Sequence, residues 1–127
     1  MLTAEKILKA QDLSELEKVD VPEWGDFVYV RKMNGMERDR WELMTAKAVE
    51  KPMSANIRAS LCVMTICDEK GKRLFTDNNM NALGAKSASA LDRIFSVSKD
   101  LNKLNDDDIE ELEKNSLTAV PAVSGSK

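Results

Sequence analysis

The 127-residue chain contains no histidine. Histidine is the commonest general base in enzymes and the commonest metal ligand in proteins, so its absence removes the usual groups for both kinds of chemistry. The phosphate-binding P-loop, the G-x-S-x-G nucleophile turn and the dinucleotide-binding glycine pattern are also missing. We therefore predict a protein that is not an enzyme and that holds neither a cofactor nor a metal ion.

Cysteine is scarce, with only Cys62 and Cys67, which lie five positions apart in one apolar segment. We expect no disulfide between them, because no secretory signal is apparent and the cytoplasm keeps thiols reduced. Their spacing is not a usual metal-binding pattern, and no histidine is present to complete a zinc site. Both side chains are predicted to be buried as small apolar groups.

Long apolar stretches are missing too. The longest run, Leu61–Cys67, is far shorter than the roughly 20 residues that span a bilayer. Near the N-terminus, Glu5, Lys6 and Lys9 interrupt any apolar signal region. The net charge of −3 argues against a dedicated nucleic-acid-binding protein, which usually has a basic face. We expect a cytoplasmic protein that binds neither membranes nor nucleic acid.

Aromatic residues make up only 5% of the chain, whereas hydrophobic residues make up 43% and charged residues 32%. The core must therefore consist mainly of aliphatic side chains and methionine, which suits packed helices better than a sandwich or barrel. A chain of this length is expected to form one domain. We place this domain at residues 1–115, because residues 116–127 are small, polar and aperiodic and are predicted to be a mobile tail.

An N-terminal β-hairpin is predicted at about residues 16–32. Val19 and Val21 lie two positions apart, as do Phe27 and Tyr29, and this period of two is typical of a half-buried strand. The strands are predicted at 16–21 and 27–32, and the connection between them contains Gly25, which suits a hairpin with a longer loop.

Apolar residues at spacings of three and four predict helices at about 4–10, 36–50, 55–67, 76–83, 87–104 and 106–114. The fold class is thus mainly α with minor β: a small domain of about five helices with a β-hairpin near its N-terminus. We expect Ile7 and Leu8 to face the core. Gly84 is expected to end the fourth helix in the left-handed conformation. Residues 61–67 also fit a strand, although the apolar stripe favours a helix. Asp68 to Gly71 is predicted to be a turn with Gly71 left-handed.

Contact with another protein is the remaining role, and aromatic, methionine and leucine side chains are the candidates for it. Methionine is flexible and can line adaptable binding grooves, although it also fills gaps in cores. Met33, Met36 and Met80 lie at the edges of predicted elements, where exposure is expected. Trp24 at the hairpin tip either folds back or meets a partner, and Leu74 and Phe75 are expected to dock into the core. The full set of candidate partner-binding residues is Trp24, Phe27, Tyr29, Met33, Met36, Trp41, Leu74, Phe75 and Met80.

Several segments together resemble a known family. They are VPEWG followed by FVYVRKMNGMERD, then CDEKGKRLFTDNN, and then NALGAKSASALDRIFSVSKDLNKLNDDDIEELEKN. In order and spacing, these segments resemble tail assembly chaperones of lambda-like long-tailed bacteriophages, roughly from Leu16 to Asn115. The resemblance implies a client, the tape measure protein, which the chaperone keeps soluble while the tail tube assembles. It further implies a longer form made by programmed frameshifting, a place in the host cytoplasm and absence from the mature virion. Self-association is expected from the residues themselves, because the hairpin and the face from Leu91 to Leu104 offer more apolar surface than a small monomer needs. The tail tube protein is a further candidate partner.

Two other classes of function remain open from the sequence. A small regulatory or antitoxin-like protein would mask one folded partner in a single stoichiometric complex. A structural tail or head-completion subunit would persist in purified virions.

Overall fold

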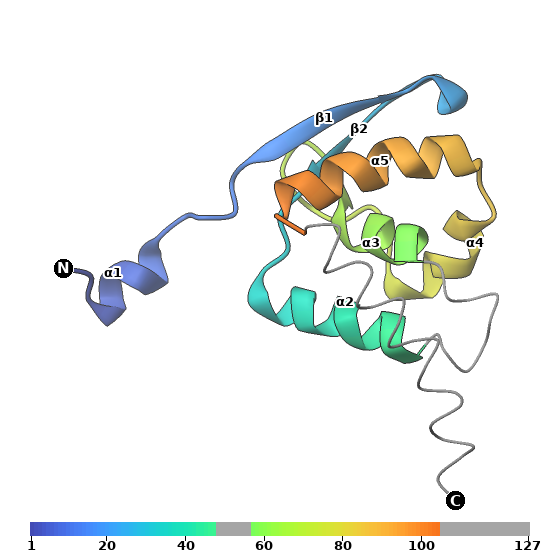
Figure 1. Cartoon of the computed structure of the whole chain (residues 1–127). Helices are drawn as coiled ribbons and strands as arrows, with labels where there is room; N and C mark the ends of the chain where they lie inside the picture. The colour runs from blue at the N-terminus through green and yellow to red at the C-terminus, as the bar shows by residue number, and fades with distance from the viewer. Residues whose placement is uncertain (48–56, 105–127) are drawn as a thin grey trace, which may run out of the picture.

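The computed structural model describes residues 1–47 and 57–104 (Figure 1). Its described part is mainly helical with a small antiparallel sheet, which confirms the predicted fold class. The helices are α1 (Ala4–Lys9), α2 (Gly35–Lys47), α3 (Ile57–Thr65), α4 (Met80–Gly84) and α5 (Ala88–Leu101). The strands are β1 (Leu16–Val21), β2 (Asp26–Arg31) and β3 (Ile66–Cys67), and two short 3-10 helices are η1 (Pro22–Trp24) and η4 (Asp77–Asn79).

The predicted hairpin is confirmed, since β1 pairs antiparallel with β2 and Val19 lies opposite Val28. Its connection is η1, which Gly25 ends with a φ of 80°. This left-handed conformation is readily available only to glycine. The alternation of the strands places Val21 and Val30 inward, where both are fully buried beneath the sheet. Helix α5 lies against this inner face (Figure 1).

Residues 61–67 combine the two structures considered for them. Helix α3 ends at Thr65, and Ile66 and Cys67 then form β3, which pairs antiparallel with β2. Within the described residues, the helical prediction is thus confirmed for 57–65 and wrong for Ile66 and Cys67, because pairing with β2 satisfies their backbone groups in the sheet. The predicted turn follows: the Asp68 carboxylate accepts hydrogen bonds from the backbone N–H groups of Lys70 and Lys72, and Gly71 has a φ of 84°.

Helix α3 is the centre of the core, and seven of its residues are buried. One group of buried side chains lies between the sheet, α3 and α5 and includes Val30, Val63 and Ile94. A second group lies between α2 and α3 and includes Trp41, whose indole Nε1 donates a 2.9 Å hydrogen bond to Ser60 Oγ. Cys62 and Cys67 are both buried, as predicted. Burial raises the pKa of the Cys62 thiol to about 12.

Helix α1 forms as predicted, but its predicted packing is wrong. Thr3 is its N-cap, since Thr3 Oγ1 accepts a 3.2 Å hydrogen bond from the Lys6 backbone N–H. Ile7 and Leu8 were expected to face the core, yet 56% and 85% of their surfaces are exposed. The reason is the connection at residues 10–15, which carries α1 away from the rest of the molecule (Figure 1).

Two helix ends differ from their predictions. Gly84 is not left-handed: α4 continues through it, and the Ala85 backbone N–H bonds back to carbonyls of that helix. Helix α5 follows its N-cap Ser87, the predicted start, but ends at Leu101 instead of 104. There the Asn102 side chain accepts from the Met33 backbone N–H at 2.7 Å, which ties the chain to the β2–α2 connection. The predicted helix at 106–114, the tail at 116–127 and the predicted end of α2 near Pro52 lie outside the described residues.

Candidate partner-binding surface

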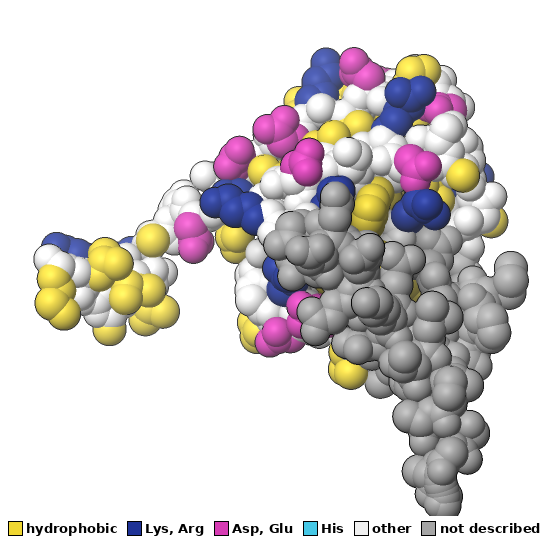
Figure 2. Space-filling model, viewed as in Figure 1, with side chains coloured by type: hydrophobic (Ala, Val, Ile, Leu, Met, Phe, Trp, Pro, Cys, Tyr) yellow, Lys and Arg dark blue, Asp and Glu magenta, His cyan; other side chains and the backbone are white. Residues whose placement is uncertain are grey.

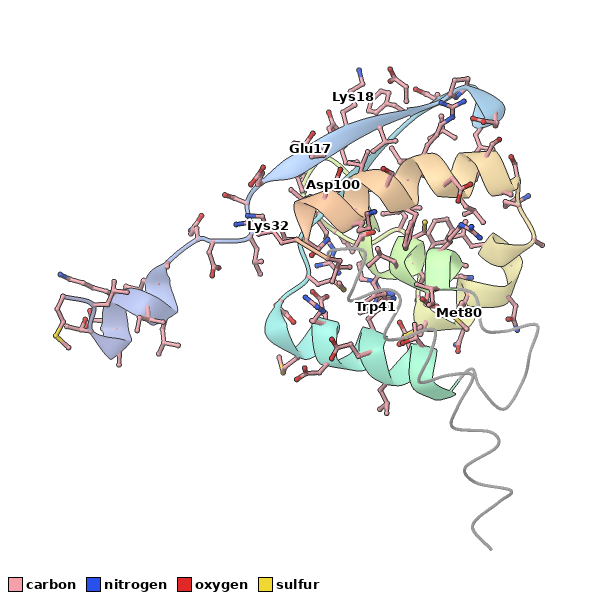
Figure 3. All side chains as sticks on the ribbon, viewed as in Figure 1. Glu17, Lys18, Lys32, Trp41, Met80 and Asp100 are labelled. Carbon is pink, nitrogen blue, oxygen red and sulfur yellow. The ribbon has the colours of Figure 1, made fainter. Side chains whose placement is uncertain are left out.

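The outer face of the hairpin carries an aromatic pair, in which Phe27 is exposed and Tyr29 is half-buried. We define this hairpin outer face by Lys18, Phe27 and Tyr29, which alternate with the inward valines. The rings of Phe27 and Tyr29 meet edge to face, with centroids 5.4 Å apart, and Lys18 Nζ lies 4.4 Å from the Phe27 centroid. Figure 3 shows Lys18 on the side of the hairpin that faces away from α5. A cation over an aromatic ring holds both side chains in place, so this face is an ordered apolar surface with a charged margin.

An apolar groove lies between the hairpin tip and α4. It has a volume of about 330 Å³ and is lined by Trp24, Phe75, Asn79, Ala82, Leu83 and Lys86. We call it the tip groove. Leu83 is buried at its base, whereas Trp24 keeps 37% of its surface exposed. Apolar concave surfaces with few polar groups are the usual places for apolar ligands and side chains to bind.

Glu23 fixes the hairpin tip, and therefore Trp24, to α5. Its carboxylate accepts a 2.7 Å hydrogen bond from Ser89 Oγ and a 3.1 Å bond from Arg93 Nε. These hydrogen bonds, that of Ser89 first, lower the pKa of Glu23 to about 2. Trp24 forms one wall of the tip groove. The position of this wall thus depends on the ionised Glu23 carboxylate.

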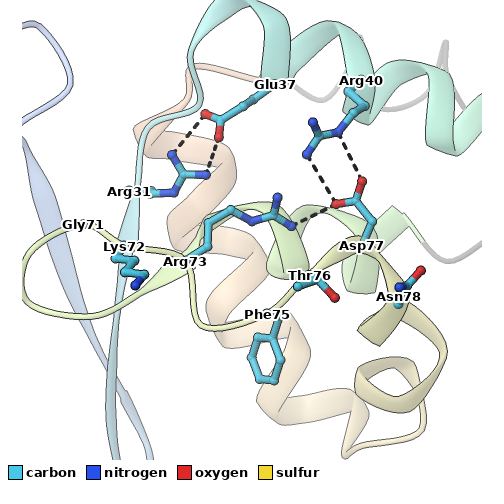
Figure 4. Close-up of a pocket in the computed structure, with 10 residues that line it drawn as sticks. All are labelled: Arg31, Glu37, Arg40, Gly71, Lys72, Arg73, Phe75, Thr76, Asp77 and Asn78. Carbon is cyan, nitrogen blue, oxygen red and sulfur yellow. Dashed lines mark hydrogen bonds and ion pairs between the residues drawn. The ribbon is translucent and has the colours of Figure 1, made fainter.

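A polar hollow of about 650 Å³ adjoins the tip groove, with which it shares Phe75 in its lining (Figure 4). Arg31 forms two hydrogen bonds with Glu37, at 3.0 and 2.7 Å, and Asp77 pairs with Arg73 at 3.0 Å and with Arg40 at 3.1 Å. Burial alone would raise the pKa of Glu37, but hydrogen bonds from Arg31 and from the Asn34 backbone N–H outweigh burial, so this pKa is lowered.

The arginines of this hollow also serve the fold. Arg31 donates to the Met64 carbonyl at 2.8 Å, and Arg73 donates to the Val63 carbonyl at 3.0 Å. Both carbonyls belong to the last turn of α3, where cationic side chains are favourable. We therefore interpret the hollow as a charge network that joins α2, α3 and η4.

Comparison with known families decides the class of protein. Residues 4–115 of the 127 match the family described as phage tail assembly chaperone. This chain belongs to that family. No curated protein and no solved structure matches the chain significantly. The resemblance found in the sequence is confirmed, and the matched region begins upstream of the hairpin, so that α1 belongs to the chaperone's family region.

The structure brings only some of the chaperone's predicted binding residues together. Trp24 and Phe75 meet in the tip groove, and Phe27 and Tyr29 share the hairpin outer face. Met80 is half-buried and packs against the core beside them.

Other candidates lie elsewhere on the chaperone. The expected surface position of Met33 is wrong, because only 8% of it is exposed and it packs beside the fully buried Trp41. Leu74 was expected in the core but is 53% exposed, whereas Phe75 next to it does pack inward. Met36 is 79% exposed at the start of α2. Met36 and Leu74 line neither the tip groove nor the hairpin outer face.

No pattern in the sequence singled out Ala82, Leu83 and Lys86, which also line the tip groove. Ala82 and Leu83 belong to the short helix α4, Lys86 lies just after it, and all three meet Trp24 only through the tertiary fold. The outward position of Lys18, by contrast, could be predicted. Lys18 directly precedes Val19 in an alternating strand, so its side chain points to the opposite face of the sheet.

Two further observations concern the described part of the chaperone. Across residues 1–47 and 57–104, no three Cys, Asp or Glu side chains gather in an arrangement that could hold a metal ion. Among the helices of the same ranges, none is long and apolar enough to cross a bilayer.

Proposed function

We propose that this chaperone binds the tape measure protein of a long-tailed phage in the host cytoplasm and keeps it soluble while the tail tube assembles. It acts without catalysis and leaves before the virion matures. Several copies act together, and they associate with one another and with a longer frameshifted form. The tail tube protein is a further candidate partner.

The match to the tail assembly chaperone family over residues 4–115 carries this proposal. A long, helix-rich, apolar client would aggregate before tube subunits surround it. A small acidic protein can cover such a client with many weak contacts, since linked contacts gain overall affinity through effective concentration. The exposed aromatic side chains of the tip groove and the hairpin outer face supply apolar contacts of moderate size, which is what reversible covering requires.

Co-expression tests the proposal directly. The tape measure protein encoded by the same phage should precipitate when made alone and stay soluble when made with this chain. The variant Trp24→Ala/Phe27→Ala should lose this effect, because it removes one aromatic side chain from each apolar surface. Leu43→Ala is the matched control, since Leu43 is 54% exposed on α2 and belongs to neither surface. Unchanged solubility of the tape measure protein with the unmodified chain would refute the proposal.

Purified virions separate the proposal from a structural role. Mass spectrometry should find this chain missing from mature particles, whereas a head or tail subunit would persist in a fixed copy number. A regulatory protein would instead form one stoichiometric complex with a folded partner. The nucleotide sequence at the 3′ end of the gene tests the frameshifted form: it should contain a slippery heptamer that overlaps a second reading frame.

A further inference from the structure

The N-terminal arm, residues 1–15, carries large apolar side chains that are exposed to solvent. Every residue of α1 is exposed, and the large apolar side chains on the arm include Leu2 at 67%, Ile7 at 56% and Leu8 at 85% exposure. Ile7 and Leu8 lie with Ala4 on one side of α1, at helical spacings of three and four. The other side carries the ion pair of Glu5 with Lys9, at 2.9 Å. Figure 2 shows the apolar side chains gathered on the arm, apart from the body of the molecule.

An isolated helix of six residues is marginal in water, because nucleation costs more than a few hydrogen bonds return. The arm nevertheless has a defined N-cap and one apolar side. A short amphipathic helix of this kind gains most of its stability when a groove covers its apolar side. The arm is therefore suited to docking.

The tip groove is a suitable receptor, and it lies at the opposite end of the molecule from the arm. The arm leaves the start of β1, whereas the groove lies beyond the end of β1 at the hairpin tip (Figure 1). In this structure the arm of a chain therefore does not occupy its own groove. Each chain carries one uncovered arm and one uncovered groove, and a second copy supplies the complement of both.

We propose that the arm of one chain inserts Ile7 and Leu8 into the tip groove of a second copy. The groove is apolar and holds about 330 Å³, which suits a few aliphatic side chains and not a long segment of chain. Its lining also includes Lys86, a cation that complements Glu5, the acidic residue of the arm's helix. This contact rests on the self-association proposed above and does not require the client.

Sedimentation of the full chain at several concentrations tests the contact. The unmodified chain should associate as its concentration rises. Ile7→Ser/Leu8→Ser should weaken association by about 100-fold or more, because it removes two large apolar side chains from the interface. Lys6→Ser/Lys9→Ser is the matched control: it makes two serine substitutions on the side of the same helix that faces away from Ile7 and Leu8, keeps Glu5, and should leave most of the association intact.

The groove is tested in the same way. Ala82→Glu places a charged side chain in the tip groove and should abolish association, whereas Asn81→Glu adds the same charge to the neighbouring exposed position, outside the lining, and should not. Mixing the arm variant with the groove variant tests whether the arm binds the groove. Chains with Ile7→Ser/Leu8→Ser keep the groove, and chains with Ala82→Glu keep the arm, so the two variants should associate with each other although neither associates with itself.

Three results would overturn the contact: a full chain that remains monomeric at high concentration, arm and groove variants that still associate with themselves, or variants that do not associate when mixed. Client solubility is a separate readout. If the Ile7→Ser/Leu8→Ser chain associates normally but no longer protects the tape measure protein, the arm binds the client and the proposed contact between copies is wrong. If association follows the arm and groove while the tape measure protein is never protected, the proposed function fails and the contact stands.

Discussion

At the scale of single residues, the two tryptophans have opposite environments. Trp41 is fully buried and hydrogen-bonded to Ser60, whereas Trp24 keeps 37% of its surface exposed. Trp41→Ala should therefore lower the free energy of unfolding by about 3–5 kcal/mol, through lost burial and the cavity left behind. Trp24→Ala should lower it by about 1 kcal/mol or less. Urea denaturation followed by circular dichroism measures both, and similar losses for the two variants would contradict the assigned environments.

The sequence predicted part of this contrast. Trp41 and Met44 lie at helical spacing, which indicates one side of a helix, but Trp41 was also named as a candidate for partner binding, and the structure places it in the core. For Trp24 the turn offered two fates, folding back or exposure, and the structure combines them: one side of the indole lines a groove and the other meets solvent. Local sequence could not decide, because the groove forms only when η4 and α4 come to the hairpin tip.

Glu23 makes the position of Trp24 dependent on pH. Its pKa is lowered from 4.5 to about 2 in the folded chain, so its contribution to stability is complete above pH 4.5 and is lost as the pH falls through 2. The indole N–H resonance of Trp24 should therefore stay in place down to well below pH 4.5 and move as the pH approaches 2. In Glu23→Gln, which cannot ionise, this transition should be absent.

The Trp41 indole resonance is the internal control for this titration, because it reports unfolding of the core. A Trp24 resonance that shifts with a midpoint near 4.5 while Trp41 is unchanged would show that Ser89 and Arg93 do not hold the Glu23 carboxylate in solution.

At the scale of secondary-structure elements, alanine substitutions at two glycines with equal space around them should change the stability of the chain in opposite directions. A Cβ added at Gly25 or at Gly35 meets no atom within 4 Å. Gly25 has a φ of 80°, so Gly25→Ala should destabilise the chain by about 1–2 kcal/mol. Gly35 is the first residue of α2, and Gly35→Ala should stabilise the chain by up to about 1 kcal/mol. Thermal unfolding of both variants measures these changes, and a loss at Gly35 as large as that at Gly25 would show that backbone conformation is not the cause.

Element types were predictable where local signals agreed with tertiary contacts. The alternation in the hairpin and the turn at Gly71 appear as expected. Predictions failed where partners distant in sequence decided the outcome. Ile66 leaves the helix because β2 offers it a strand partner, and α5 ends early where Asn102 bonds to the β2–α2 connection. Gly84 was assigned to a helix end from residue type alone, yet α4 needs no left-handed residue there.

At the scale of the whole molecule, the sheet and helices form one body whose apolar surfaces lie around the hairpin tip, while the arm extends from the other end (Figure 1). The acidic and basic side chains of the polar hollow are largely paired with one another, so they stabilise the body. The sequence predicted most of the body. It predicted the helix of the arm but not that this helix stands apart from the body, because an amphipathic helix has the same pattern whether its own chain or another protein covers it.

Removal of residues 1–12 should therefore weaken the association of copies while leaving the stability of a single copy almost unchanged. At low protein concentration the free energy of unfolding should change by no more than about 0.5 kcal/mol, since every residue of α1 is exposed. At high concentration the unmodified chain should become more stable as copies associate, because association stabilises the folded state by mass action, whereas the shortened chain should show no such dependence. Urea midpoints measured over a hundredfold range of concentration test both points. A loss of stability at low concentration would mean that the arm packs on its own body in solution, and an equal concentration dependence for both chains would place the contact between copies elsewhere.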